Sequence, residues 1–188
     1  MAPSHAASAA NSRSGFAVEG HESIRDAAPD DFAAILALNA DSVHFLSPLS
    51  GDQLANLHRQ AAYHRVVERH GRIAAFLLVL REGADYDSPN YRWFAQRYPQ
   101  FLYIDRIVVA ADRQGHGLAA MLYDDLLAFA KTTGVETLTC EFDLDPPNPA
   151  SAKFHARYGF REVGTQWLGG GKKQVSLQAR ALPASSST

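Results

Sequence analysis

Runs of apolar residues along the chain change their period from place to place, and this period distinguishes strands from helices. Ile73–Leu80 is a short continuous apolar run, and Phe101–Ala110 is strand-like although Asp105 and Arg106 interrupt it, which is typical of buried strands. Apolar residues at helical spacing follow Pro29 and fill Leu118–Lys131. The pattern predicts strands at 23–27, 63–69, 73–81, 101–110, 135–142, 159–167 and 172–180, and helices at 29–39, 54–61, 91–98, 118–131 and 150–158.

The connections between these elements predict how the strands pair. His70-Gly71 and Gly169–Gly171 each join two strands over a short distance, so each predicts an antiparallel hairpin. Between residues 101 and 142, a strand, a glycine loop, a helix closed by Gly134 and a second strand follow one another, which predicts a parallel crossover. We therefore expect one mixed α/β domain, with a mostly antiparallel sheet and helices on both faces.

The two ends of the 188-residue chain differ in composition from the part between them. Residues 1–20 are rich in Ala and Ser and lack the apolar stretch of a secretory signal, so we predict a flexible tail. A similar tail is expected at 182–188, which leaves a single domain at 21–181. The longest strongly apolar run has eight residues, too few to span a bilayer.

Charge and cysteine content narrow the classes of partner and cofactor. Eighteen Lys and Arg against twenty Asp and Glu give a net charge of −2, so no global basic field favours nucleic acid or an anionic membrane. Cys140 is the single cysteine, which excludes an internal disulfide and a multi-thiolate zinc site. The histidines show no zinc spacing, so we expect no metal, and the cysteine content fits a cytoplasmic location.

The segment Gln114–Ala119 lies between a predicted strand and a predicted helix. Unpaired amides at a helix N-terminus bind phosphate oxygens, and glycine lets the backbone approach the anion. The segment predicts a phosphate or pyrophosphate site, although a glycine turn that only redirects the chain has the same pattern. A P-loop is excluded, because no Gly-Lys-Ser/Thr occurs. A dinucleotide site fits Gly115, Gly117, Ala120 and Glu141, but too few residues follow for its further βαβ units.

Two motifs in the C-terminal half carry a resemblance to a known family. Gln114, Gly117 and Ala119 match the pattern Gln/Arg-x-x-Gly-x-Gly/Ala. The segment Asn148–Phe160 matches the pattern Asn-x-x-Ala/Ser-x-x-Phe/Leu-Tyr-x-x-x-Gly-Phe, except at its tyrosine. With the expected elements between them, the two motifs resemble those of the GNAT superfamily of acyl-CoA N-acyltransferases. The resemblance implies that superfamily's fold, in which one parallel pair of strands splays apart.

The resemblance implies acetyl-CoA as the acyl donor, with no metal required. Backbone amides of residues 114–119 would hold its pyrophosphate, and the strand that ends at Val109 would pair with the pantetheine arm. The Val109 N–H would stabilise the tetrahedral oxyanion. Asn148 would contact the cofactor, although it is also typical of a helix N-cap that binds no ligand. The residues assigned to acetyl-CoA in this way are Ile107, Val108, Val109, Gln114, Gly115, His116, Gly117, Leu118, Ala119, Asn148, Ser151, Phe154 and His155.

His155 stands where many members of the superfamily carry a tyrosine that protonates the departing thiolate. Imidazole donates a proton near neutral pH, so His155 is a candidate for the general acid. The alternative is a packing histidine, with water as the proton donor. Tyr158, one helical turn further on, is a second candidate, although its ring suits a core position.

The attacking amine must lose a proton, and carboxylates near the predicted strand ends are candidates for the base. Glu141 is near the end of its strand, where ligand sites form in parallel sheets. Period-two geometry places alternate residues from Tyr103 to Val109, Asp105 among them, on one strand face. Asp105 or Glu141 would receive the proton through water. The alternative for each is a structural salt bridge, and Arg106 is next to Asp105.

These residues predict transfer of an acetyl group from acetyl-CoA to a primary amine by direct attack, without a covalent enzyme intermediate. The acceptor stays open, because small-molecule, peptide and protein amines all fit. The aromatic segment 86–98 would line its pocket or cover the partner in a homodimer. Three alternatives stand beside this prediction: a dinucleotide-binding oxidoreductase, a non-catalytic acyl-CoA-binding module, and an interaction protein that uses an exposed aromatic segment.

Overall fold

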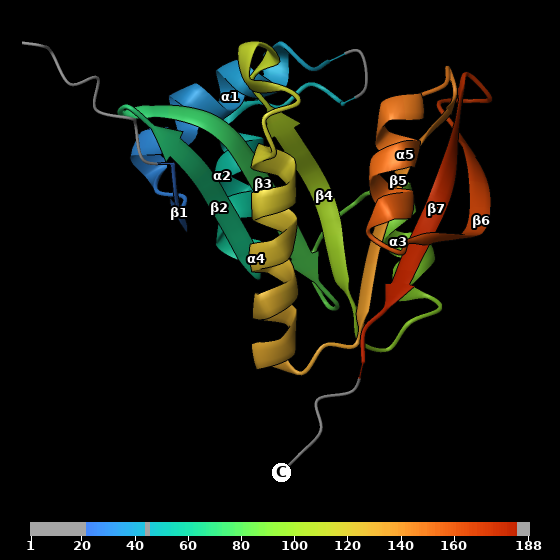
Figure 1. The fold of residues 1–188 in the computed structure, drawn as a ribbon. Coiled ribbons are helices and arrows are strands. Elements are labelled where there is room, and N and C mark those ends of the chain that lie inside the picture. Colours follow the sequence, from blue (N-terminus) through green and yellow to red (C-terminus); the bar gives the residue numbers. More distant parts are fainter. Residues whose placement is uncertain (1–21, 44–45, 184–188) are drawn as a thin grey trace, which may run out of the picture.

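A computed structural model of the chain describes residues 22–43 and 46–183. Its strands are β1 (Ser23–Asp26), β2 (Tyr63–Arg69), β3 (Arg72–Arg81), β4 (Leu102–Val109), β5 (Thr137–Asp145), β6 (Arg161–Leu168) and β7 (Lys173–Ala181). Within the described residues they form one seven-stranded sheet in the order β1-β2-β3-β4-β5-β7-β6 (Figure 1). Only β4 and β5 pair in parallel there, so the predicted fold class is confirmed. The predicted tail 1–20 lies outside the described residues, and so does the predicted tail 182–188 apart from Leu182 and Pro183.

Helices cover both faces of this sheet. They are α1 (Phe32–Ala40), α2 (Gly51–Gln60), α3 (Pro89–Ala95), α4 (Leu118–Thr133) and α5 (Pro149–Arg157). α4 and α5 lie on one face, and α1, α2 and α3 lie on the other (Figure 1). Their ends follow local sequence signals: Ser50 caps α2 by accepting a hydrogen bond from the Gln53 N–H, and Gly134 ends α4 in the left-handed conformation.

Each face of the sheet has its own hydrophobic core. Leu122 and Leu126 of α4 are fully buried in the first core, and Phe94 of α3 is fully buried in the second. Leu182, which the sequence analysis places in the C-terminal tail 182–188, also packs in the first core. Its N–H donates to Glu136 O at 2.7 Å. Leu182 is therefore both packed and hydrogen-bonded in the structure.

The aromatic segment between β3 and β4 folds onto the sheet. Tyr91 and Phe94 of α3 are 3% and 0% exposed, because their rings fill the second core. Trp93 packs so closely on Gly164 of β6 that an added Cβ there would lie 2.7 Å from its ring. The short helix was predicted correctly. Trp93 and Tyr98 are partly buried against the same core, so the segment is less exposed than the alternative of an interaction protein expects.

β4 and β5 stay paired over only two residues each. Leu102 pairs with Leu138 and Tyr103 pairs with Thr139, and beyond that point the strands diverge (Figure 1). The other edge of β4 stays bonded to β3, and the other edge of β5 stays bonded to β7. The sheet is therefore divided into two halves that meet at one end of β4 and β5.

A β-bulge in β4 lies directly beyond the last of these pairs. Leu78 and Val79 are consecutive in β3, but their partners in β4 are Arg106 and Ile104, so Asp105 is the extra residue. A bulge of this kind moves the side-chain alternation by one residue. It also bends the bulged strand, which agrees with the separation of β4 from β5 at this point.

The bulge separates residues that a regular strand would place on one face. Tyr103 packs in the core under α1, α2 and α3, whereas Ile107 and Val109 pack against the core under α4 and α5. The prediction that alternate residues from Tyr103 to Val109 share a face is therefore wrong. The period-two rule fails because it assumes one residue for each partner along the whole strand.

Candidate active site

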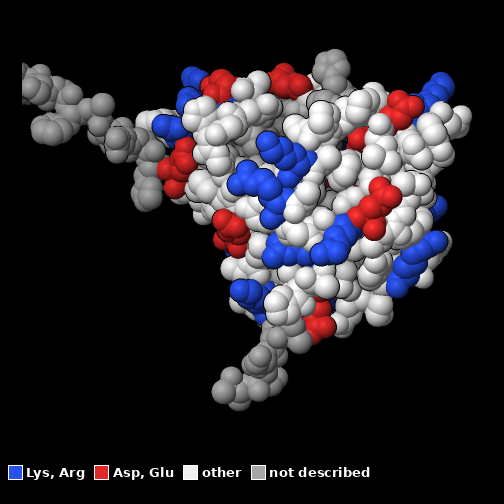
Figure 2. All heavy atoms as spheres, turned by 45° about the vertical axis from the view of Figure 1, so that its right-hand side comes forward, with Lys and Arg blue, Asp and Glu red and all other residues white. Residues whose placement is uncertain are grey.

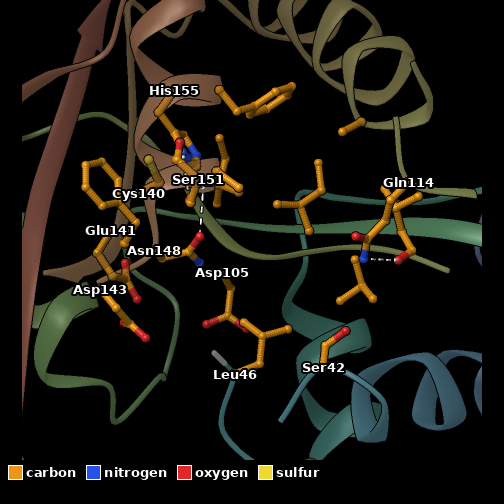
Figure 3. Close-up of a pocket in the computed structure, with 18 of the residues that line it drawn as sticks. Ser42, Leu46, Asp105, Gln114, Cys140, Glu141, Asp143, Asn148, Ser151 and His155 are labelled. Carbon is orange, nitrogen blue, oxygen red and sulfur yellow. Dashed lines mark hydrogen bonds between the residues drawn. The ribbon is translucent and has the colours of Figure 1, made fainter. Parts of the chain in front are cut away.

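A cavity of about 580 Å³ lies between the diverging strands β4 and β5 (Figure 3). Its other walls come from the loop and first turn of α4, and from α5 with the loop before it. His116 is outside the lining; its exposed side chain donates from Nδ1 to Gln114 O. Apart from His116 and Tyr158, every site residue expected from the sequence lines the cavity: Asp105, Ile107, Val108, Val109, Gln114, Gly115, Gly117, Leu118, Ala119, Glu141, Asn148, Ser151, Phe154 and His155.

The loop before α4 presents backbone amides to one end of this cavity. Gly115 and Gly117 have φ angles of 79° and 85°, in a region that residues with a Cβ rarely adopt. The first helical hydrogen bond of α4 runs from the Met121 N–H to Gly117 O, so the amides of residues 118–120 have no partner within the helix. Together with the dipole of a 16-residue helix, these amides are suited to bind an anion.

The end of β4 presents a further backbone group. Ala110 donates its N–H to Ala74 O at 2.9 Å, and in an antiparallel ladder this directs the N–H and C=O of Val109 away from β3. The side-chain amide of Gln114 donates to Val109 O at 3.4 Å, which agrees with this direction. The Val109 N–H therefore points toward the side from which β5 has diverged, and Val109 lines the cavity.

The carboxyl group of Glu141 is held by one oxygen only. Its Oε1 accepts hydrogen bonds from the Tyr103 hydroxyl and from Asn90 Nδ2, each at 2.9 Å. Its Oε2 is buried and accepts no hydrogen bond from the residues that the structure describes. Burial raises the pKa of this carboxyl to about 7, against the opposing effect of the two donors. A carboxylate with a pKa near neutrality and a free oxygen is suited to act as a base.

Asn90 is itself held in the orientation that Glu141 requires. Gln166 of β6 donates from Nε2 to Asn90 Oδ1 at 3.0 Å. Because that bond identifies the acceptor end of the Asn90 amide, the other end is directed at Glu141 as a donor. Asn90 is 6% exposed, so α3 and β6 together fix the position of the Glu141 carboxyl.

Asp105 lies across the cavity from Glu141, but both its oxygens are engaged (Figure 3). Oδ1 accepts a hydrogen bond from the Tyr86 hydroxyl at 2.7 Å, and Oδ2 accepts one from Arg106 Nε at 3.1 Å. Burial raises the pKa of Asp105, and the Arg106 cation opposes this shift. Of the two readings that the sequence left open for Asp105, these contacts favour the salt bridge.

Both ring nitrogens of His155 have partners. Nδ1 lies 2.8 Å from Ser151 O, which can only accept, so Nδ1 carries a proton. Nε2 lies 2.8 Å from the hydroxyl of Tyr123. Burial lowers the pKa of His155 and so favours the neutral ring, in which Nε2 accepts from that hydroxyl. The side chain is thus held between α4 and its own helix.

Two other residues expected at the site have clear local roles. The Tyr158 hydroxyl lies 3.1 Å from Asp124 Oδ1 and from Ala120 O, and Tyr158 does not line the cavity between β4 and β5. It is therefore not placed to act as the second candidate for the general acid. Asn148 caps α5 by accepting a hydrogen bond from the Ser151 N–H at 3.1 Å, and it also lines the cavity.

Sequence reasoning assigned no role to Asn90 or Lys173, which also line the cavity. Asn90 is 51 residues from Glu141 in the chain, and no local pattern marks it as a partner. Lys173 Nζ lies 2.8 Å from Asp143 Oδ1. Only Asp143 carried a signal, because it follows Glu141 by two residues and shares its strand face.

Comparisons with known proteins agree with this fold. Ard1 from Thermoplasma volcanium is similar with a TM-score of 0.71 and 15% sequence identity, covering 86% of this chain and 97% of that one. The ribosomal-protein-S18-alanine N-acetyltransferase from Escherichia coli has a TM-score of 0.66 and 18% identity, with 86% and 94% covered. The protein yncA from Salmonella typhimurium, solved with its cofactor acetyl-CoA, has a TM-score of 0.67 and 18% identity, with 89% and 98% covered. A search of the curated proteins finds no match.

The sequence itself matches the model of the acetyltransferase (GNAT) family over residues 23–160. The chain therefore belongs to the GNAT family and is an acyltransferase, and the resemblance carried by its two motifs is confirmed. The dinucleotide-binding alternative is wrong, because that fold needs several parallel strands, whereas the described sheet has one parallel pair.

Neither a metal-binding cluster nor a membrane-spanning helix is present in the described residues. Across 22–43 and 46–183, no group of three or more His, Cys, Asp or Glu side chains is arranged to hold a metal ion. In the same part of the chain, no helix combines the length and apolar character that crossing a bilayer requires.

Proposed function

We propose that this protein transfers an acetyl group from acetyl-CoA to a primary amine by direct attack. One observation carries the proposal: free helix amides, the outward N–H of Val109 and the free oxygen of Glu141 belong to the walls of one cavity. Binding of an acyl-CoA, stabilisation of an oxyanion and deprotonation of an amine require these three kinds of group. The yncA structure with acetyl-CoA supports the same donor.

Each wall of the cavity has its own task in this mechanism. Acetyl-CoA supplies the activated thioester; the amides of residues 118–120 bind its pyrophosphate, and the free edge of β4 pairs with its pantetheine arm. Glu141 receives a proton from the acceptor ammonium, and the amine nitrogen then bonds to the acetyl carbon. The Val109 N–H stabilises the resulting oxyanion until the carbon–sulfur bond breaks.

Water is the proton donor that we assign to the departing thiolate. His155 would first have to break its bond to Ser151 O or to Tyr123, since both ring nitrogens are engaged. We therefore assign His155 the positioning of α5 against α4, beside the cavity. Its role as general acid stays a prediction, which the comparison of variants described in the Discussion tests.

Direct attack also agrees with the state of the one cysteine in the chain. Cys140 lines the cavity but is 1% exposed, and burial raises the pKa of its thiol. A thiol is nucleophilic as its thiolate, so this environment does not favour an acyl-cysteine intermediate.

A thermal-shift titration tests the acyl donor. A ligand at 100 times its Kd stabilises a protein by about 2.7 kcal/mol, which raises the Tm of a domain of this size by roughly 5–11 °C. We expect such a rise with acetyl-CoA and none with NADH or NADPH. Absence of a response to acetyl-CoA would contradict the proposal.

Release of free CoA tests catalysis separately from binding. We expect amines to accelerate the release of CoA. In Glu141→Gln, the amine-dependent rate should fall by at least about 100-fold, which is the usual contribution of a general base. The Tm shift with acetyl-CoA should stay unchanged in this variant, because the groups that we assign to its pyrophosphate and pantetheine arm do not include Glu141. Release that amines do not accelerate would instead favour the non-catalytic acyl-CoA-binding module. A cytoplasmic location and a homodimer stay predictions.

A further inference from the structure

The part of the cavity around Glu141 contains an ion pair that the proposed reaction does not use. Lys173 Nζ of β7 lies 2.8 Å from Asp143 Oδ1 of β5, and both residues line the cavity. Asp143 follows Glu141 by two residues along β5, and the two side chains lie next to each other on the cavity wall (Figure 3). The Asp143 side chain is 6% exposed, whereas that of Lys173 is partly exposed at 34%.

Two carboxyl oxygens in this part of the cavity have no hydrogen-bond donor. Asp143 Oδ2 and Glu141 Oε2 are both buried, and neither has a hydrogen-bond partner among residues 22–43 and 46–183. A buried carboxylate oxygen without a donor is unfavourable, so a ligand that supplies donors here gains affinity. An ammonium group has three N–H donors and can serve both oxygens together.

Lys173 distinguishes between kinds of amine. The Lys173 cation offsets the charge of Asp143. An amine or polyamine without a carboxylate would therefore enter the site with its own positive charge close to that of Lys173. An acceptor with a carboxylate beside its ammonium uses the whole pair: its carboxylate meets Lys173 Nζ, and its ammonium meets Asp143 Oδ2. An ion pair and a zwitterion are complementary charge for charge.

We infer that the acceptor is a free α-amino acid, bound as a zwitterion by Asp143 and Lys173, with its ammonium next to Glu141. The inference rests on the proposed function, because it takes Glu141 as the base. It deepens that function by naming the class of acceptor. The cavity volume of about 580 Å³, which has to contain the acetyl thioester as well, agrees with a small acceptor.

The transfer balances with the groups named. The ammonium gives one proton to the Glu141 carboxylate and the nitrogen bonds to the acetyl carbon. The carbon–sulfur bond then breaks, and the second proton that the nitrogen loses passes through water to the CoA thiolate. The product is an N-acetyl amino acid, which has lost the ammonium charge and kept the carboxylate. Its contacts with Asp143 and Glu141 weaken, and this favours product release.

Matched pairs of acceptors test the inference. Each proteinogenic L-amino acid and its carboxamide share an α-ammonium and a side chain, and only the amino acid has the α-carboxylate. For the best pair, we expect kcat/KM to favour the amino acid by about 10- to 100-fold, the range of one hydrogen bond between charged groups. Lys173→Met should bring this ratio close to one. Lys172→Met, which changes the adjacent exposed lysine, should leave it as in the wild type.

Product binding provides a measurement that does not depend on turnover. By calorimetry on the enzyme saturated with CoA, the N-acetyl amino acid of the best pair should bind more tightly than its carboxamide. Lys173→Met should bind the two equally. A wild type that acetylates carboxamides or simple amines as well as amino acids overturns the inference and leaves the proposed function standing. No Tm shift with acetyl-CoA would overturn both.

Discussion

At the scale of single residues, the neighbours of a carboxyl group decide what it is suited to do. Asp105 and Glu141 lie on the two diverging strands and face the same cavity. Asp105 has a cationic partner, Arg106, and no free oxygen, whereas Glu141 has two neutral donors on one oxygen and a free second oxygen. Glu141 is therefore the better candidate for the base, although the sequence placed both near strand ends.

Asn90→Ala should change the pH dependence of the reaction. Asn90 stabilises the ionised form of Glu141, so its loss raises the pKa of that carboxyl above about 7. Since the base must be ionised, the acid limb of the kcat/KM profile should move to higher pH. At pH 6.5 we expect a loss of roughly tenfold, the value of one hydrogen bond to a charged group. Activity should recover at alkaline pH.

The control for this experiment is Asn56→Ala, which truncates an exposed asparagine of α2. Its profile should coincide with that of the wild type. A loss in Asn90→Ala that is equal at every pH would show that Asn90 acts on folding or on acceptor binding and leaves the pKa of Glu141 unchanged.

His155→Phe separates positioning from proton donation. The substitution leaves the Tyr123 hydroxyl buried without its acceptor, which costs about 1–3 kcal/mol. We expect a lower Tm and a turnover per folded molecule within about tenfold of the wild type. Tyr123→Phe removes the same hydrogen bond from the other side, so the double variant should lose less stability than the sum of the two single variants. A general acid would instead contribute roughly 100-fold or more to turnover.

At the scale of elements, the two ends of α4 are alike in conformation and different in surroundings. Gly117 at its start and Gly134 at its end both have positive φ, and an added Cβ would meet no atom within 4 Å at either position. Only Gly117 lines the cavity. The same backbone requirement therefore serves a binding site at one end of the helix and chain termination at the other.

Gly117→Asp should abolish the binding of acetyl-CoA. A carboxylate about 4 Å from the pyrophosphate costs roughly 4 kcal/mol at an effective dielectric of 20, so affinity should fall by at least about 100-fold. Gly134→Asp imposes a similar backbone strain on the far end of the helix and should keep the acetyl-CoA affinity of the wild type. Isothermal titration of the two variants makes the comparison, and equal affinities would move the anion site elsewhere.

At the scale of the whole molecule, the site depends on two cores that hold the halves of the sheet at different angles. Neither half contains the site, because the anion-binding amides follow β4 while Glu141, Asp143 and Lys173 belong to β5 and β7. Charge is also arranged by the fold. Figure 2 shows Lys and Arg side chains gathered across the middle of one face, although the chain has a net charge of −2.

The sequence by itself determined the elements, their order and the side of the cavity that presents the amides of the loop before α4. Its signals there are local: helix caps, hairpin turns, and the glycines of the loop before α4 lie within a few residues of the structure that they specify. The motif residues from Gln114 to Ala119, and Asn148 with Ser151, could be found for the same reason.

Only the tertiary structure decided which carboxyl is free, where the strand faces change and what surrounds Glu141. The bulge at Asp105 depends on pairing with β3, and the hydrogen bonds to Glu141 come from residues 38 and 51 positions away. A pKa near 7 follows from burial by elements that are distant in the chain. Such contacts leave no period or motif in the sequence, because they arise when separate elements pack together.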